Sequence, residues 1–118
     1  IKTPSGNLYF VGDSGYGEGE YFKRSRVKHG DYRFAILPMG AYAPRWFMSY
    51  GHMNPEEAVK AYEDLGKPHT LPSHYDVFHL AGEGYGDALK ELDVIRETNP
   101  AEKFKPLQVG QMWQIPLT

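Results

Sequence analysis

The sequence predicts an α/β (α+β) fold in which one mixed β-sheet is covered by helices. Two observations lead to this prediction. Short apolar runs with strand composition alternate along the chain with longer segments of helical spacing, and no internal repeat or low-complexity tract interrupts them. The length of 118 residues fits one small domain, so we assign residues 1–118 to a single unit.

The first half of the chain contains two strand candidates separated by a helix candidate. Residues 7–12 form an apolar and aromatic run that ends in the tight turn starting at Asp13. Residues 18–29 carry enough charge for a surface helix. Residues 33–38 form a second buried strand, which Pro38 stops from extending. The following loop, residues 39–53, is long and rich in Gly, Pro, Met and aromatic residues, which is typical of functional loops.

The strongest helix signal lies between Asn54 and Gly66. Asn54 is a favourable N-cap, Pro55 fits the first helical position and Glu57 completes a capping-box pattern. Gly66 ends the helix. Apolar residues recur at helical spacing and predict an amphipathic helix that covers a sheet: Ala58, Val59, Tyr62 and Leu65.

Three weaker elements complete the prediction. Residues 70–75 form a short extended segment. Residues 86–97 form a helix with Leu89, Leu92 and Ile95 on one face, and residues 107–116 alternate loosely as a last strand.

Composition excludes several classes of function. The net charge is −2, with 13 basic and 15 acidic side chains mixed along the chain, which gives no electrostatic signature of nucleic-acid binding. There is no cysteine, so any bound metal must use His, Asp or Glu ligands. No apolar run approaches the roughly 20 residues that span a bilayer. We therefore expect a soluble chain, either cytoplasmic or peripherally associated with a membrane.

The candidate metal ligands are Asp13 and the five histidines. His69, His74 and His79 are spaced five apart, which matches neither one helical face nor one face of a strand, so they do not predict a single site. Asp13 and His74 each follow a short apolar strand, at the sheet edge where α/β proteins bind ligands. From spacing alone, Asp13 is more often a turn carboxylate than a ligand, and His74 could be only a buried, hydrogen-bonded imidazole. His29, His69 and His79 are interpreted as structural or surface residues.

Four motifs occur in a fixed order. They are Phe-Val-Gly-Asp-Ser-Gly-Tyr at 10–16, Leu-Pro-Met-Gly-Ala-Tyr-Ala-Pro-Arg-Trp-Phe-Met at 37–48, His-Met-Asn-Pro-Glu-Glu-Ala at 52–58, and His74 followed by Phe78. Together they resemble the second half of the NAPE-phospholipase-D-like and RomA-like metallo-β-lactamase-fold proteins. The resemblance is close over about residues 7 to 80. The long loop motif is specific, whereas a lone Gly-Asp-Ser-Gly would be weak.

This resemblance implies half of a four-layer αββα sandwich and a zinc-dependent hydrolase. It assigns to Asp13 the bridge between two zinc ions and to His74 the ligation of one of them. A carboxylate has two oxygens for two cations, and two cations activate one hydroxide for attack on a phosphodiester or related ester bond. Other divalent metals also accept such ligands.

The resemblance further places the loop after residue 38 over the metal site. It implies that Tyr42, Arg45 and Met48 shape the substrate pocket and that His52 is an acid/base group or a phosphate contact. Two simpler interpretations stay open. Arg45 could only pair with a loop carboxylate, and three neighbouring side chains could simply be core residues: Trp46, Phe47 and Met48.

The sequence also departs from the family pattern. The family commonly has His-Trp-Gly-Thr-Phe where this chain has His-Tyr-Asp-Val-Phe at 74–78, so Asp76 adds a charge beside the proposed ligand. The His-x-His-x-Asp-His motif that supplies most family ligands is absent from these residues. We therefore expect residues 1–118 alone to bind zinc weakly and to be inactive. The alternative is a binding or assembly module that lacks catalysis.

The resemblance also implies a partner for the sheet. In an αββα sandwich the face that carries Leu8, Phe10 and Ile36 packs against the other half's sheet. We therefore expect either a second chain segment carrying the N-terminal half or a homo-oligomer formed through this face.

Overall fold

A computed structural model of the chain describes residues 1–117. Their strands form one four-stranded sheet. The strands are β1 (Lys2–Thr3), β2 (Gly6–Phe10), β3 (Tyr32–Pro38) and β4 (His69–Ser73), and they lie in sequence order across the sheet. β1 is antiparallel to β2, whereas β2, β3 and β4 are parallel. The predicted mixed sheet and the α/β class are confirmed, and the arrangement is consistent with half of a metallo-β-lactamase fold.

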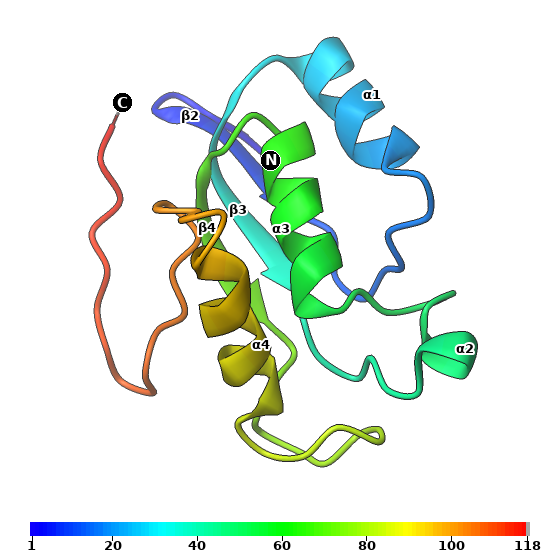
Figure 1. The fold of residues 1–118 in the computed structure, drawn as a ribbon. Coiled ribbons are helices and arrows are strands. Elements are labelled where there is room, and N and C mark those ends of the chain that lie inside the picture. Colours follow the sequence, from blue (N-terminus) through cyan, green and yellow to red (C-terminus); the bar gives the residue numbers. More distant parts are fainter. Residues whose placement is uncertain (118) are drawn as a thin grey trace.

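Helices cover one face of this sheet (Figure 1). α1 (Glu20–His29) connects β2 to β3, and α3 (Pro55–Asp64) lies between β3 and β4 along the chain. α4 (Asp87–Arg96) packs against α3. The loop after β3 contains a further short helix, α2 (Arg45–Met48), which the sequence did not predict.

Helix α3 begins as its sequence predicts. The Asn54 side chain accepts the Glu57 backbone N–H at 2.9 Å, and the Glu57 carboxylate accepts the Asn54 backbone N–H at 3.2 Å. This reciprocal capping box fixes the position at which the loop after β3 meets the helix. The predicted apolar face is buried in full: Ala58, Val59, Tyr62 and Leu65.

The core lies between the sheet and these helices. Ala35 and Leu37 of β3 are closed to solvent on this side, and so is Phe22 of α1. Thr70 of β4 is also buried, where its hydroxyl donates to the Pro68 carbonyl at 2.9 Å. Because its polar atom is paired, Thr70 adds volume to the core without an unsatisfied group.

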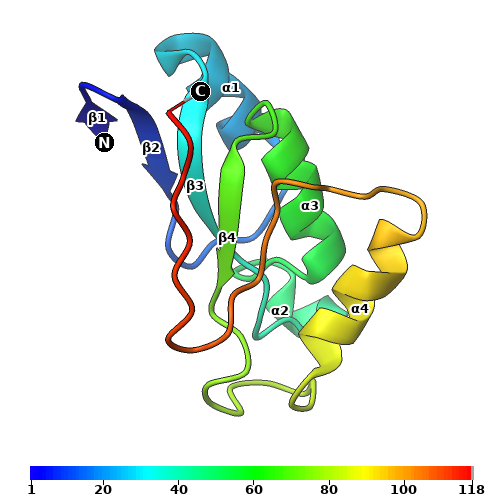
Figure 2. The same cartoon turned by 90° about the vertical axis from the view of Figure 1, so that its left-hand side faces the viewer.

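The opposite face of the sheet carries a second set of apolar side chains. The parallel register pairs Leu8 with Phe34 and Phe10 with Ile36, so these four side chains share a face. Phe10 is 66% exposed, and the other three are only partly buried. Figures 1 and 2 show that, within residues 1–117, only the C-terminal segment runs along this side.

The predicted last strand at 107–116 is wrong. Residues 105–117 contain no strand, and the only continuation of the ladder is one isolated bridge between Thr70 and Phe104. The segment is tied to the sheet by a side chain instead: the Arg33 guanidinium donates to the carbonyls of Ile115 and Pro116 at 2.7 and 2.9 Å. The apparent alternation came from side chains such as Met112, which are exposed rather than turned toward a sheet.

Among the helices of residues 1–117, none is long and apolar enough to cross a membrane.

Candidate functional site

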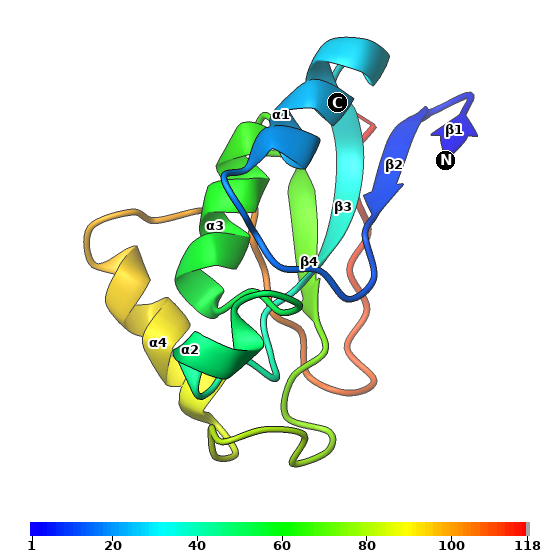
Figure 3. The same cartoon turned by 90° about the vertical axis from the view of Figure 1, so that its right-hand side faces the viewer.

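Three loops meet where the parallel strands end, in the lower part of Figure 3. Asp13 follows β2, Gly40 follows β3 and His74 follows β4. Because the strands are parallel, their carboxyl ends lie at one edge, and side chains far apart in sequence are brought together there.

Asp13 and His74 meet at this edge. Asp13 Oδ1 lies 3.4 Å from His74 Nε2, with the carboxylate side chain 62% exposed and the imidazole 23% exposed. The expectation that the two side chains converge is therefore confirmed. Their role as metal ligands stays a prediction.

A contact at Nδ1, the other ring nitrogen, orients the His74 imidazole. Nδ1 lies 3.4 Å from the Gly40 carbonyl oxygen, at the long end of hydrogen-bond contact. When Nδ1 carries the proton, the Nε2 lone pair faces the Asp13 side, which is the arrangement that metal-ligating histidines usually adopt. Gly40 is required for this approach because a Cβ at that position would lie 1.7 Å from the His74 carbonyl oxygen.

His52 lies against His74. The two imidazole rings are stacked, with centroids 5.4 Å apart and planes 11° apart. Nδ1 of His52 is buried and has no hydrogen-bond partner among residues 1–117. A second close backbone approach holds this loop beside Asp13, because a Cβ at Gly15 would lie 2.4 Å from the Tyr50 carbonyl oxygen. The loop therefore places one polar imidazole edge near the Asp13 and His74 pair.

Arg45 is fastened inside the same loop. Its guanidinium pairs with the Glu57 carboxylate and also donates to the carbonyls of Tyr42 and His52 at 3.0 and 3.2 Å. Glu57 belongs to the capping box of α3, so Arg45 connects the His52 backbone to a fixed helix end. Met48 is partly exposed at the end of α2.

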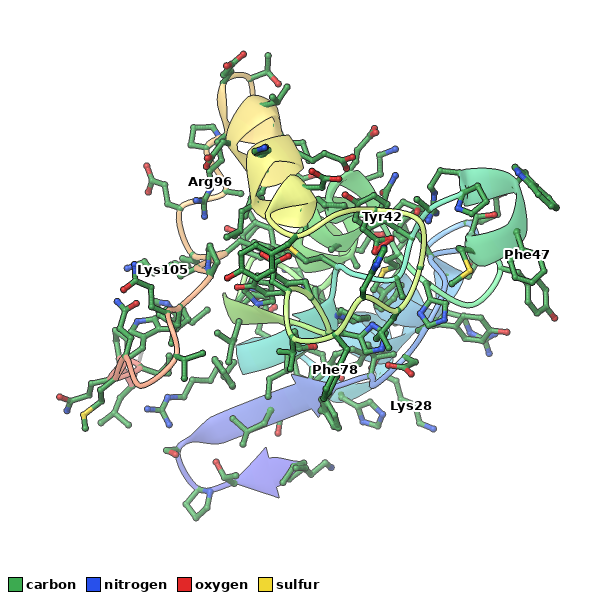
Figure 4. The ribbon with its side chains drawn as sticks, turned by 90° about the horizontal axis from the view of Figure 1, so that it is seen from below. Lys28, Tyr42, Phe47, Phe78, Arg96 and Lys105 are labelled. Carbon is green, nitrogen blue, oxygen red and sulfur yellow. The ribbon has the colours of Figure 1, made fainter. Side chains whose placement is uncertain are left out.

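Tyr42 is buried in the core with 4% of its surface exposed. Burial raises the pKa of its hydroxyl, and the nearby Glu91 carboxylate raises that pKa further, so the phenol stays protonated near neutral pH. The large exposed side chains of this loop are different ones, Trp46 and Phe47, at 85% and 68% exposure. Their interpretation as core residues is therefore wrong. Figure 4 views the molecule from below, with Phe47 at its outer margin.

The loop after His74 contains two acidic residues whose contacts matter. Glu83 accepts backbone N–H groups from Ala41, Tyr42 and Ala43, a contact that no sequence signal indicated. Asp76 accepts the Gly86 N–H at 2.9 Å, where α4 begins. Its φ of 57° is left-handed, a conformation that Asp tolerates and that suits the glycine of the family pattern. Its charge is thus directed to a helix N-terminus, where it is stabilised.

The available ligands fit part of a divalent-cation site. A carboxylate and an imidazole with a free Nε2 suit zinc and related ions. Within residues 1–117, however, no group of three or more His, Asp or Glu side chains is arranged to hold a metal. Asp13 and His74 can therefore fill two ligand positions and leave the remainder to groups outside this set.

Comparison with known proteins identifies the family. A family model described as "Beta-lactamase superfamily domain" matches residues 1–75. The chain belongs to this superfamily. The matched residues contain all three parallel strands and both Asp13 and His74.

Named relatives narrow the relationship. The chain is 34% identical over 111 residues to N-acyl-phosphatidylethanolamine-hydrolyzing phospholipase D 1 of Caenorhabditis elegans, an alignment covering 91% of this chain and 31% of the relative. It is 34% identical over 100 residues to the mitochondrial enzyme of the same description from Saccharomyces cerevisiae, covering 82% and 21%. It is 39% identical over 72 residues to outer membrane protein RomA of Klebsiella pneumoniae, covering 61% and 52%.

These relationships confirm the resemblance to the NAPE-phospholipase-D-like and RomA-like branch. They connect this superfamily member with a family that contains named hydrolases. The chain spans about a third or less of the two phospholipase D relatives and about half of RomA.

Proposed function

We propose that residues 1–118 are the C-terminal part of a zinc-dependent hydrolase that acts on phosphodiester or related ester bonds. One observation carries the proposal: Asp13 Oδ1 and His74 Nε2 lie 3.4 Å apart at the carboxyl edge of three parallel strands. The names of the phospholipase D relatives support the substrate class. The ligands that are missing here would come from the N-terminal half of the same protein.

In this proposal Asp13 would be shared between two zinc ions, and His74 would be a ligand of one of them. Bound zinc, or another divalent metal, supplies an acidified water and positive charge beside the substrate's developing negative oxygen. Residues of this chain orient the ligand. The Gly40 carbonyl oxygen lies against His74 Nδ1, which keeps the Nε2 lone pair directed toward Asp13.

His52 is proposed as the acid/base group or phosphate contact. Its ring lies parallel to that of His74, and its buried Nδ1 lacks a partner among the described residues, so a hydrogen bond with a substrate oxygen would satisfy it. Of the proposed substrate-binding residues, Met48 would contact substrate through its exposed part. Arg45 and the buried Tyr42 would act by holding the shape of the loop.

The partner is proposed to cover the open face of the sheet. Leu8, Phe10 and Ile36 share that face, where Leu8 and Ile36 are only partly buried and Phe10 is exposed. The N-terminal half of the same protein would pack on them, and a second copy of the chain would do so in a homo-oligomer.

The test uses the full-length protein that contains these residues, with zinc and bis(p-nitrophenyl) phosphate as the substrate. We expect hydrolysis that a chelator abolishes, and Asp13→Ala should reduce kcat/KM by more than about 100-fold, because it removes a ligand and not merely its support. His79→Ala is the control, since His79 is exposed on the loop beyond His74. Because the Asp13 side chain is 62% exposed within residues 1–117, the metal-free variant should unfold at the same temperature as the metal-free unmodified protein.

Two results would contradict the proposal. Equal losses in Asp13→Ala and His79→Ala would remove the assigned site. A full-length protein that binds zinc without hydrolysing any ester would favour the non-catalytic binding module instead. For residues 1–118 alone we expect weak zinc binding and no hydrolysis, which calorimetric titration checks.

A further inference from the structure

Glu83 makes an unusual set of contacts for a loop carboxylate. Its two oxygens accept three consecutive backbone N–H groups, those of Ala41 at 3.1 Å, Tyr42 at 2.8 Å and Ala43 at 2.9 Å. Successive N–H groups that converge in this way form a nest, a backbone concavity that binds anions. Here the anion is a side chain of the same protein, supplied from about forty residues further along the chain.

The nest forms because the backbone turns sharply after β3. Ala41 has a left-handed φ of 58°, which rotates its N–H toward the same side as the next two. A further bond, from the Gly82 N–H to the Ala43 carbonyl at 2.8 Å, joins the same two segments. Four hydrogen bonds thus connect residues 41–43 of the loop after β3 with Gly82 and Glu83 of the loop after β4.

The other end of this contact reaches His74. Gly40 immediately precedes the nest, and its carbonyl oxygen lies 3.4 Å from His74 Nδ1. The Gly40 backbone also touches the His74 backbone so closely that no Cβ fits between them. His74 itself has a left-handed φ of 63°, a conformation that the surrounding contacts must maintain. Movement of residues 40–43 would therefore move the group that orients the His74 ring.

The geometry points to Glu83 as a positioning residue: its carboxylate fills the nest at residues 41–43, fixes the Gly40 carbonyl against His74 Nδ1 and so directs His74 Nε2 toward Asp13. This inference rests on the proposed function only for what His74 then binds. The hydrogen bonds that Glu83 makes with residues 41–43 do not depend on that function, because they lie within residues 40–83.

A carboxylate is needed here for a physical reason. The three N–H groups are donors, and a carboxylate offers two oxygens that only accept. Glu83→Gln replaces one oxygen by an NH₂ group, which meets a backbone donor with another donor. Glu83→Ala removes both oxygens and leaves a vacated nest into which a small carboxylate such as formate can bind.

The experiment measures formate rescue in the full-length protein, freed of metal by a chelator so that formate cannot act at a cation. We expect Glu83→Ala to lower the unfolding temperature by on the order of 5–10 °C, because three partly buried N–H donors lose their partner. Sodium formate should restore a substantial part of that loss compared with sodium chloride at equal ionic strength. The unmodified protein and Glu83→Gln should not respond to formate.

The matched control is Asp87→Ala. Asp87 is a carboxylate of the same region that accepts a single N–H, from Gly84 at 2.7 Å, and forms no nest. It should show no selective rescue by formate. Equal formate responses in Glu83→Ala and Asp87→Ala, or no response in either, would overturn the assignment.

A second readout separates positioning from general stability. The His74 ring resonances should shift in Glu83→Ala and return toward their original values with formate. Zinc affinity should fall by roughly 10-fold, as for other residues that support a metal ligand. Unchanged His74 resonances in a folded Glu83→Ala variant would show that Glu83 holds only the loop.

Two further outcomes keep the test decisive. If Glu83→Ala does not fold, amide exchange in the unmodified protein replaces it: slow exchange at Ala41, Tyr42 and Ala43 supports the nest, and fast exchange overturns it. If formate rescue and ring shifts are observed but zinc affinity is unaffected, the positioning role of Glu83 is supported and the proposed metal ligation by His74 fails.

Discussion

The two faces of the sheet differ in what covers them, although one strand contributes to both. On β3, Ala35 and Leu37 point to the helices and have no exposed surface, whereas Phe34 and Ile36 point to the other side and are only partly buried. The first face is closed by α1 and α3 of the same chain. Among the described residues, the second is crossed only by the C-terminal segment. The chain therefore completes one core and leaves the other face open to association.

The covered face also determines the site. α3 is anchored to this face by its buried residues and holds Glu57, which in turn pairs with Arg45 in the loop that carries His52. We therefore expect changes on the covered face to affect both stability and site geometry, and changes on the open face to affect mainly association.

The largest expected effect follows from truncating the covered face. Leu37→Ala should lower the free energy of unfolding by about 2–5 kcal/mol, because it leaves a cavity in a fully packed region. Ile36→Ala, one residue earlier on the same strand, should cost distinctly less, since its side chain is only partly buried. Urea unfolding of both variants makes the comparison. Equal costs would mean that the open face is as well packed as the covered one.

This contrast also explains what the sequence could predict. Helix α3 was predicted almost to the residue because its capping box, Pro55 and apolar spacing are local signals that the tertiary structure reinforces. The convergence of Asp13 and His74 was predictable because both follow parallel strands. The C-terminal strand was predicted wrongly because its pattern has no partner in residues 1–117. Instead, Trp113 packs edge-on against Phe34.

The site details were the least predictable. The Glu83 nest depends on backbone φ at Ala41 and on a contact across some forty residues, neither of which leaves a pattern in the sequence. Tyr42 shares its loop with Trp46, yet the first is buried and the second exposed, because Tyr42 lies beside Glu91 of α4 whereas α2 projects outward (Figure 1).

A smaller effect is expected where the C-terminal segment crosses the open face. Trp113 packs edge-on against Phe34 and His69, with Lys105 Nζ 5.4 Å from its ring centroid. Trp113→Ala should lower the free energy of unfolding by about 1–2 kcal/mol, below the cost of removing a fully buried aromatic residue. Met112→Ala is the control and should change it by less than about 0.5 kcal/mol, since Met112 is 91% exposed. A negligible effect of Trp113→Ala would show that the segment only rests on the sheet.

His69, which packs against Trp113, predicts that the stability of the fold depends modestly on pH. Burial lowers the pKa of His69, and the neighbouring Lys103, Lys105 and Arg33 charges lower it further. In the unfolded chain His69 titrates near 6.5, so below that pH the unfolded state binds the proton more readily than the folded state. Stability should therefore fall as the pH decreases from 7.5 through 6.5 until the lowered folded pKa is passed. His69→Gln should reduce this slope, whereas His79→Gln, on an exposed loop, should leave it unchanged.

The smallest expected effect on stability concerns Phe10, and it decides what the open face is for. Phe10 is 66% exposed at the end of β2, so Phe10→Ser in residues 1–118 should change the free energy of unfolding by less than about 0.5 kcal/mol. If a second copy covers this face, light scattering should show weaker association for Phe10→Ser. Val27→Ser, which alters an 88% exposed residue on α1, should have no such effect.

If the N-terminal half covers the face instead, Phe10 is buried in the full-length protein, and the same substitution should cost about 1.5–3 kcal/mol there. A Phe10→Ser variant that changes neither association of residues 1–118 nor the stability of the full-length protein would show that no partner uses this face, because a covered phenylalanine cannot lose its ring without a cost in one of the two measurements.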